Sequence, residues 1–132
     1  MKTIKITIER GADNYGGFSE NVPGIYGAGD SVEEVKQNIL EAIDLLKEEN
    51  SNDKLPSELQ GNYEVVYQLD VASLLNYYKG IFTNSALERI TGINQKQLQH
   101  YSTGLRKPRV QQRVKIQNAL HNLGSELLAL EL

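Results

Sequence analysis

The chain begins with strict alternation of apolar and polar residues, which predicts a strand with one buried face. The buried positions of this strand are expected to be Ile4, Ile6 and Ile8. Turn-forming residues then separate two further expected strands. The turns are at 11–17 and Pro23-Gly24, and the strands are at 18–22 and 25–28.

The next segment carries the clearest helical pattern of the chain. Ser31 and Glu34 form a capping box, in which each side chain can bond a backbone N–H of the first turn. An apolar stripe at helical spacing follows, made of Val32, Val35, Ile39, Ala42, Ile43 and Leu46. Residues 50–62 are turn formers and predict a loop, and strand alternation returns at 63–69. The order β-β-β-α-β predicts a small α+β layer with one helix on a sheet.

The remaining chain predicts only helices, so we expect an α+β protein with domains at 1–69 and 70–132. A first helix is expected to end near Gly80, and Thr83 or Asn84 caps a second. The turn Thr91-Gly92-Ile93 leads to a third helix with Leu98 and Tyr101 inward. A loop at 103–109 precedes a last helix over 110–123.

Charge divides between the two halves. Residues 1–69 hold 6 Lys/Arg against 13 Asp/Glu, whereas residues 70–132 hold 8 against 4. Between Arg89 and Lys115 there are seven basic side chains and no acidic one. A basic surface on two short helices joined by a turn is typical of proteins that bind a phosphate backbone. The C-terminal half is therefore predicted to bind DNA.

The third helix has the residue types that read base edges. Gln can bond two positions of adenine in the major groove, and Lys can donate to guanine. Cations of the following loop would contact phosphates without reading sequence. The predicted DNA-binding residues are Thr83, Asn84, Asn94, Gln95, Lys96, Gln99, His100, Arg106, Lys107, Arg109 and Arg113.

Two motif series resemble known families. The run Tyr15-Gly-Gly-Phe-Ser-Glu-Asn-Val-Pro-Gly24 precedes Ala28-Gly-Asp-Ser-Val-Glu-Glu-Val35, and Asn38 and Glu41-Ala-Ile43 follow. Over residues 1–49 this order and spacing are similar to the N-terminal domain of HicB antitoxins. The resemblance implies a partial RNase H-like fold without catalytic carboxylates, which binds and blocks a small HicA toxin, an mRNA interferase.

Residues 83–124 resemble the XRE/Cro-type helix-turn-helix family. The matching runs are Leu87-Glu-Arg-Ile-Thr-Gly-Ile-Asn94, His100-Tyr-Ser-Thr-Gly-Leu-Arg-Lys-Pro108, Lys115-Ile116 and Ala119-Leu120. One HicB subtype is similar in carrying such a domain at this place. Together the resemblances imply a type II antitoxin that neutralises a HicA-like toxin and represses its own operon by binding operator DNA. The expected toxin-binding residues are Glu9, Asp13, Tyr15, Phe18, Glu20 and Tyr26.

Size and composition add expectations about the assembly. Two modules of 60–70 residues each bury only about 60% of their unfolded surface, so we expect a homodimer or larger oligomer. The leucine-rich tail at 125–132 either completes the core or forms a dimer contact, and we favour the contact. The chain has no cysteine and no apolar run of membrane-spanning length, and we expect a cytoplasmic protein. No cofactor or metal is expected, because His100 and His121 have no Cys or paired carboxylate near them.

Three alternatives stay open. The N-terminal half could sense a small molecule, which would make the protein a ligand-responsive transcription regulator. It could be a metal-dependent nuclease using Glu9, Glu64, Asp30, Glu33 and Glu34, although the last three are also explained as acidic groups that complement a helix N-terminus. The helix-turn-helix could also serve dimerisation alone, without DNA binding.

Overall fold

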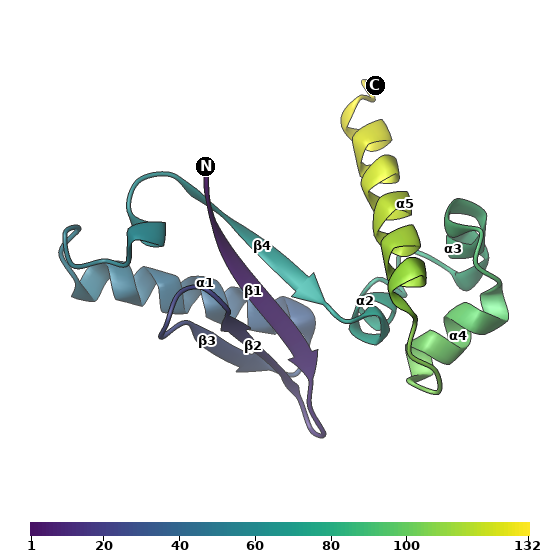
Figure 1. The fold of residues 1–132 in the computed structure, drawn as a ribbon, viewed down its shortest axis with the longest axis horizontal. Helices are drawn as coiled ribbons and strands as arrows, with labels where there is room; N and C mark the ends of the chain where they lie inside the picture. Colours follow the sequence, from purple (N-terminus) through teal and green to yellow (C-terminus); the bar gives the residue numbers. More distant parts are fainter. The chain divides into compact units, whose positions relative to one another are not determined.

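A computed structural model describes all residues from Met1 to Leu132 and divides them into two compact units, Met1–Ser73 and Leu74–Leu132. The α+β class is confirmed (Figure 1). The first unit contains strands β1 (Lys2–Arg10), β2 (Tyr15–Ser19), β3 (Tyr26–Gly29) and β4 (Tyr63–Leu69), helix α1 (Val32–Glu49) and the short 3₁₀ helix η1 (Ser57–Leu59). The helices α2 (Val71–Tyr77), α3 (Asn84–Thr91), α4 (Gln95–Thr103) and α5 (Val110–Leu128) follow, and the division between the units falls inside α2.

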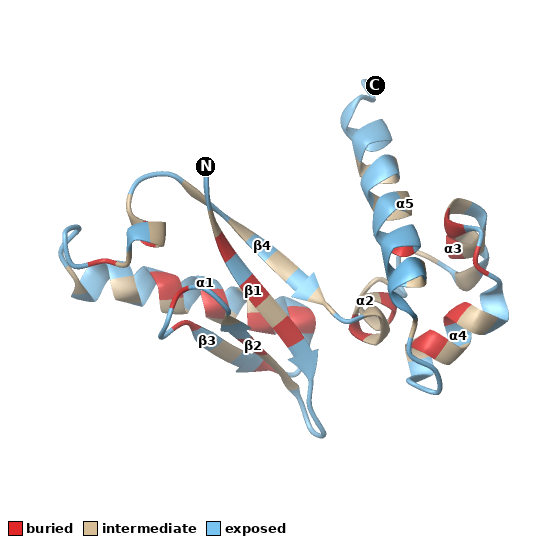
Figure 2. Cartoon of the chain, in the orientation of Figure 1, coloured by how far each residue is buried: buried red, intermediate tan, exposed pale blue.

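The first unit is a mixed four-stranded sheet with α1 packed on one face. The strand order is β3-β2-β1-β4, in which β1 is antiparallel to β2 and parallel to β4. Ile4, Ile6 and Ile8 of β1 are fully buried, as their alternation predicts. The facing stripe of α1 is formed by Val32, Val35, Ile39 and Ile43. Figure 2 shows these two rows of buried residues.

The start of α1 agrees with its predicted cap. Ser31 is the N-cap, and its Oγ accepts a hydrogen bond from Glu34 N at 3.1 Å. This bond satisfies one of the N–H groups that the first turn leaves without a helical partner. The predicted beginning of this helix is therefore confirmed.

The predicted second strand is wrong by three residues at each end. It was expected at 18–22, but β2 spans Tyr15–Ser19, and the turn is confined to residues 11–14. Gly16 and Gly17, which favour a turn by composition, lie within the strand, and α1 passes close to the second of them. A Cβ on Gly17 would lie 2.8 Å from Cγ1 of Val35. Glycine is thus required here for helix–sheet packing rather than for bending the chain.

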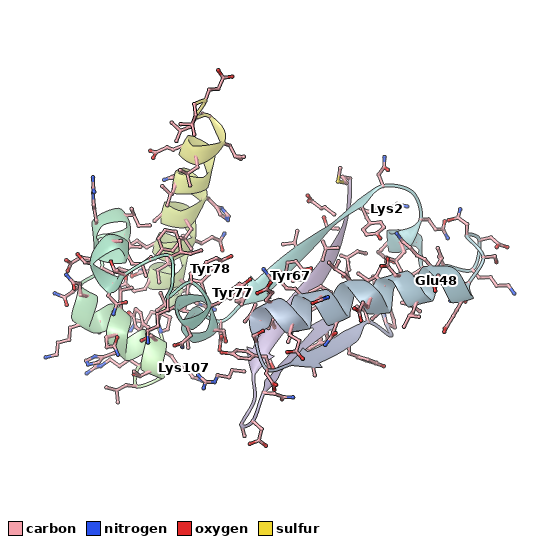
Figure 3. The ribbon with its side chains drawn as sticks, turned by 180° about the vertical axis from the view of Figure 1, so that it is seen from behind. Lys2, Glu48, Tyr67, Tyr77, Tyr78 and Lys107 are labelled. Carbon is pink, nitrogen blue, oxygen red and sulfur yellow. The ribbon has the colours of Figure 1, made fainter.

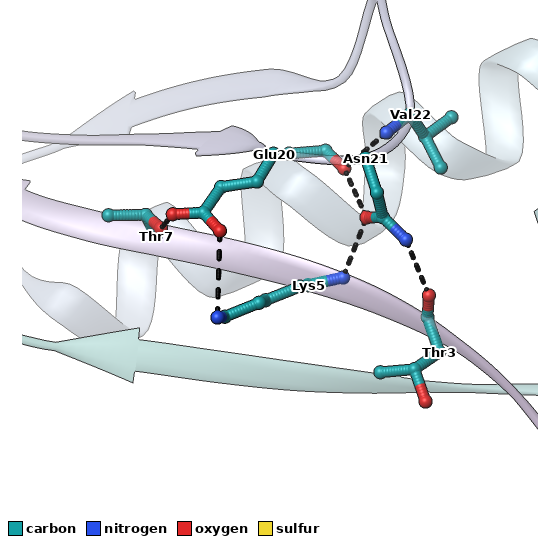
Figure 4. Close-up of polar contacts among 7 residues, drawn as sticks. Thr3, Lys5, Thr7, Glu20, Asn21 and Val22 are labelled. Carbon is teal, nitrogen blue, oxygen red and sulfur yellow. Dashed lines mark hydrogen bonds and ion pairs between the residues drawn. The ribbon is translucent and has the colours of Figure 1, made fainter.

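The end of β2 is fixed by one side chain that substitutes for a strand residue. Asn21 Oδ1 accepts from Lys5 N at 3.1 Å, and Asn21 Nδ2 donates to Thr3 O at 2.8 Å (Figure 4). The amide satisfies backbone groups of β1 after β2 has ended. The chain can therefore leave the sheet at Ser19 without exposing unpaired groups, and Val22 is buried.

The segment 50–62 was predicted to be a loop, but it contains η1 and contributes to the core. Leu55 and Leu59 are buried. Lys2 Nζ donates to the carbonyl oxygens of Ser57 and Gln60, at 2.7 and 2.8 Å. Apolar residues separated by four positions in a polar segment give no clear helical period, so the sequence pattern did not distinguish this turn from a solvated loop.

Two lysines of α1 cover tyrosine rings of β4. Lys36 Nζ lies 4.6 Å from the ring centroid of Tyr67, and Lys47 Nζ lies 4.5 Å from that of Tyr63. Tyr67 is labelled in Figure 3. Burial lowers the pKa of Lys36 and raises the pKa of Tyr67. The lysine stems thus cover apolar surface while the charged ends interact with the rings.

The second unit is built only of helices and has a small core. Its buried apolar residues are Leu75, Leu87, Ile93, Leu98, Tyr101 and Ile116. The last helix is longer than predicted, ending at Leu128 instead of 123, because Gly124 does not interrupt it. A glycine inside a helix costs about 1 kcal/mol, and the good helix formers Glu126, Leu127 and Leu128 follow it. None of the helices combines the length and apolarity that crossing a bilayer requires.

Candidate functional site

The turn between α3 and α4 has a defined geometry. Thr83 caps α3, with its Oγ1 accepting from Ala86 N at 3.0 Å. Gly92 ends the helix with φ 76°, a left-handed conformation that a side chain disfavours. Thr91 Oγ1 donates to Leu87 O at 2.6 Å and accepts from Ile93 N at 3.0 Å. These bonds set the direction in which α4 leaves the turn.

Helix α4 separates a buried from an exposed side as predicted. Leu98 and Tyr101 are buried, whereas Gln95, Lys96 and Gln99 are exposed. Asn94 is the N-cap, and its Oδ1 accepts from Lys96 N at 2.8 Å. The side-chain oxygen of Asn94 is therefore engaged in holding the helix end.

Two of the exposed glutamines are oriented by α3. Gln95 donates from its backbone N to Glu88 Oε1 and from Nε2 to Glu88 Oε2, both at 3.2 Å. Asn84 Nδ2 donates to Gln99 Oε1 at 3.0 Å. Sequence reasoning included Asn84 but missed Glu88, the acidic residue that directly precedes the acid-free stretch. The separation of seven residues between Glu88 and Gln95 does not predict a contact. The turn between α3 and α4 brings the two side chains together.

The loop after α4 carries most of the remaining charge. Arg106, Lys107 and Arg109 are exposed, and Arg113 is exposed on α5. Lys107 is labelled in Figure 3. Gly104, with φ 80°, ends α4, and Arg109 is the N-cap of α5 without a side-chain capping bond. The guanidinium of Arg109 is thus not engaged in the cap.

One predicted DNA-binding residue, His100, lies differently from expectation, and another, Thr83, has the capping role that the sequence also predicts for it. His100 was placed on the exposed side of α4, but it is half-buried, and its Nδ1 is enclosed without a hydrogen-bond partner. The chain turns back after α4, so that Arg106 N donates to His100 O at 3.2 Å. Thr83 lines a hollow between α3 and α5, and its hydroxyl serves the cap.

The face of the sheet opposite α1 is uncovered within the first unit. The register pairs Thr7 with Phe18 and Phe18 with Tyr26, which places all three on this face. Phe18 is 41% exposed, Tyr26 is 70% exposed, and Val66 of β4 is 42% exposed. Glu20 lies beside Thr7, and its Oε1 accepts a hydrogen bond from Thr7 Oγ1 at 2.7 Å. Its Oε2 lies 3.6 Å from Lys5 Nζ. We call this surface the open sheet face.

Only some of the predicted toxin-binding residues lie on the open sheet face. Glu9, Phe18 and Tyr26 belong to the open sheet face, and Glu20 borders it. Strand alternation places Tyr15 on the opposite face, where Arg10 lies 5.9 Å from its ring centroid. Asp13 is in the turn between β1 and β2. Sequence reasoning missed Val66, although its alternation with the half-buried Val65 and Tyr67 places it outward.

The carboxylates considered for a nuclease do not converge. Glu64 pairs with Thr3, six residues from Glu9 along β1, which corresponds to about 20 Å of strand. Asp30, Glu33 and Glu34 belong to the beginning of α1. No group of three His, Cys, Asp or Glu residues is arranged to hold a metal ion.

Comparison with protein-family models, curated proteins and solved structures gives no match to this chain. The similarity to HicB and XRE/Cro-type proteins therefore rests on the motif residues. The structure agrees with it in layout, a β-β-β-α-β mixed sheet followed by a helical region.

Proposed function

We propose that this protein is a DNA-binding antitoxin, which binds operator DNA through α4 and the loop after it and a toxin through its sheet unit. The observation that carries the DNA-binding part is the exposed side of α4. Gln95, Lys96 and Gln99 are exposed there, while Leu98 and Tyr101 anchor the helix from the other side.

The chemistry of this surface suits duplex DNA. Exposed glutamine and lysine near the beginning of a helix can reach base edges in the major groove. Arg106, Lys107 and Arg109 supply cations on the next loop, where they would position the protein on phosphates. The whole stretch from Arg89 to Lys115 lacks an acidic residue that would repel the backbone.

Fluorescence anisotropy with a duplex from the region preceding the protein's own gene tests this proposal, with a scrambled duplex for comparison. If about five cations meet phosphates, affinity should fall by about 10²–10³-fold between about 50 and 200 mM salt. Replacing Lys96, Arg106 and Arg109 together by Ala should abolish most of the binding. The matched control is Lys54→Ala, an exposed lysine of the sheet unit. Salt-independent affinity, or full binding by the triple variant, would contradict DNA binding by this surface.

The toxin-binding part is supported by the open sheet face and by the sign of the charge around it. Residues 1–69 hold more than twice as many acidic as basic side chains, which would complement a basic, RNA-binding toxin such as a HicA-like protein. Phe18 and Tyr26 offer exposed aromatic rings of the kind that dominate binding energy at interfaces.

Co-expression with a short basic HicA-like toxin, of the kind that the resemblance to HicB implies for a neighbouring gene, tests the toxin-binding part. We expect the two proteins to co-purify, and Tyr26→Ala with Phe18→Ala to lower the affinity at least about tenfold. Leu45→Ala is the control, because Leu45 is an exposed apolar residue of α1, away from the open sheet face. Equal affinity of both variants would remove the open sheet face from the toxin interface.

A further inference from the structure

Within the helical unit, a hollow of about 740 Å³ lies between α3 and α5. Phe82, Ile90 and Leu123 give it apolar walls, and Arg89 and Glu126 line it as well. No ion pair joins Arg89 to Glu126 within the chain. We call this hollow the α3/α5 groove. It combines apolar surface with one charge of each sign.

The apolar stripe of α5 continues beyond the helices that cover it. Ile116, Leu120, Leu123 and Leu127 follow one another at intervals of three or four residues, which places them on one side of the helix. Exposure rises along this stripe, from 3% at Ile116 to 57% at Leu127. Figure 1 shows the last turns of α5 extending past α3. Leu127 thus has the position of a core residue, yet more than half of its surface is exposed.

The core of this unit is small for a domain that must fold alone. Only six apolar residues of Leu74–Leu132 are buried, while Leu127, Leu128 and Leu130 are exposed. Units of this size bury too little surface to be more than marginally stable. A contact that covers the leucines would add the missing apolar burial.

We propose that the α3/α5 groove and the last turn of α5 form a two-fold interface between two copies of this chain. Leu127 of each copy fills the groove of the other, and Arg89 pairs with Glu126 of the partner subunit. A second copy is the occupant because one patch carries both parts, a projecting leucine and an apolar hollow, together with both charges. A patch that meets itself across a two-fold axis makes each such contact twice.

Charge reversal with mixing tests the pairing between chains. In a homodimer, Arg89→Glu brings two carboxylates together at each of the two contacts, and Glu126→Arg brings two guanidinium groups together there. Each full-length variant alone should therefore be monomeric under conditions where the natural chain is dimeric. An equimolar mixture should form a heterodimer, in which one of the two contacts joins the unchanged Arg89 and Glu126 and the other joins the two reversed charges.

Native mass spectrometry separates these species by mass. We expect dimers of the natural chain and of the mixture. We expect only monomers from either variant alone. A monomeric natural chain, variants that dimerise unchanged, or a mixture that stays monomeric would overturn the proposal.

An apolar variant tests the same interface independently of charge. Leu127→Asp should raise the dimer dissociation constant about tenfold or more in analytical ultracentrifugation. Val114→Asp is the matched control, since Val114 is 50% exposed on another side of α5. Circular dichroism checks that both variants keep their helices. Equal dissociation constants for the two variants would also overturn the proposal.

This interface deepens the proposed function, because a dimer would present two copies of α4 to two half-sites. The two proposals nevertheless fail separately. Dimerisation without DNA binding would support the interface and contradict the binding of operator DNA. Binding of a monomer to a single half-site would support DNA binding and contradict the interface.

Discussion

The side-chain nitrogen of Asn84 donates to Oε1 of Gln99 at 3.0 Å, so the first residue of α3 orients an exposed amide of α4. A glutamine that reads adenine must present its oxygen and nitrogen in one order, and a neighbouring bond that fixes the amide reduces the cost of ordering it.

We predict that Asn84→Ala lowers discrimination between operator and scrambled duplex about tenfold, a loss typical of one mispositioned base contact. Affinity for the scrambled duplex should stay unchanged, because no cation is removed. Competition anisotropy measures both quantities, and Asn118→Ala, on the exposed surface of α5, is the control. An equal loss on both duplexes would indicate that Asn84 supports the fold rather than the reading of bases.

Glu88 holds Gln95 but also brings a negative charge to the edge of the basic surface. We predict that Glu88→Gln raises affinity for any duplex about three- to tenfold at low salt, because a repulsion is removed. The gain should shrink as salt screens the charge. Anisotropy titrations across a salt series check this expectation. Unchanged binding at low salt would place Glu88 away from the DNA, and weaker binding would mean that its hydrogen bonds to Gln95 outweigh the repulsion.

Gly17 and Gly16 are neighbours in β2 with opposite environments. A Cβ at Gly17 would lie 2.8 Å from Val35, whereas a Cβ at Gly16 meets nothing within 4 Å. Gly17→Ala should therefore lower the free energy of unfolding by about 1–3 kcal/mol, and Gly16→Ala should change it by less than about 1 kcal/mol. Urea unfolding followed by circular dichroism compares them. Similar effects of the two substitutions would mean that α1 does not approach the sheet this closely.

The carboxyl of Glu20 should titrate at a lower pH than that of an ordinary glutamate. Its hydrogen bond from Thr7 and the charge of Lys5 hold its pKa below the ordinary 4.5. Because the folded-state pKa is the lower one, this group stabilises the fold above its unfolded pKa, and the contribution disappears as pH falls through the folded pKa. NMR titration should show the lowered pKa, and Thr7→Val should move it toward 4.5. A pKa unaffected by Thr7→Val would assign the shift to another cause.

Much of the fold follows from local patterns. The alternation of Ile4, Ile6 and Ile8 identifies the central strand, and the Ser31 cap and apolar stripe identify α1. The predicted start of β2 was wrong because Gly16-Gly17 favours a turn by composition. The requirement for glycine at position 17 comes from the approach of α1, a contact between distant segments that no local pattern contains.

The candidate DNA surface was predictable to a similar degree. The spacing of Leu98 and Tyr101 defines the buried side of α4, and the exposure of Gln95, Lys96 and Gln99 follows from it. The enclosure of His100 depends on how the chain turns back after Gly104. The hydrogen bonds from Gln95 to Glu88 depend on the geometry of the turn between the helices. Both are tertiary relationships, which periodicity alone does not encode.

The ion pair of Lys5 and Glu20 beside exposed aromatic rings has a further consequence. Flat apolar sheet faces tend to stack on copies of themselves, and charged groups placed within them oppose such stacking. The pair would therefore keep this surface exposed and unassociated in water. If the proposed toxin binds this face, the ion pair would protect the face from self-association before the toxin arrives.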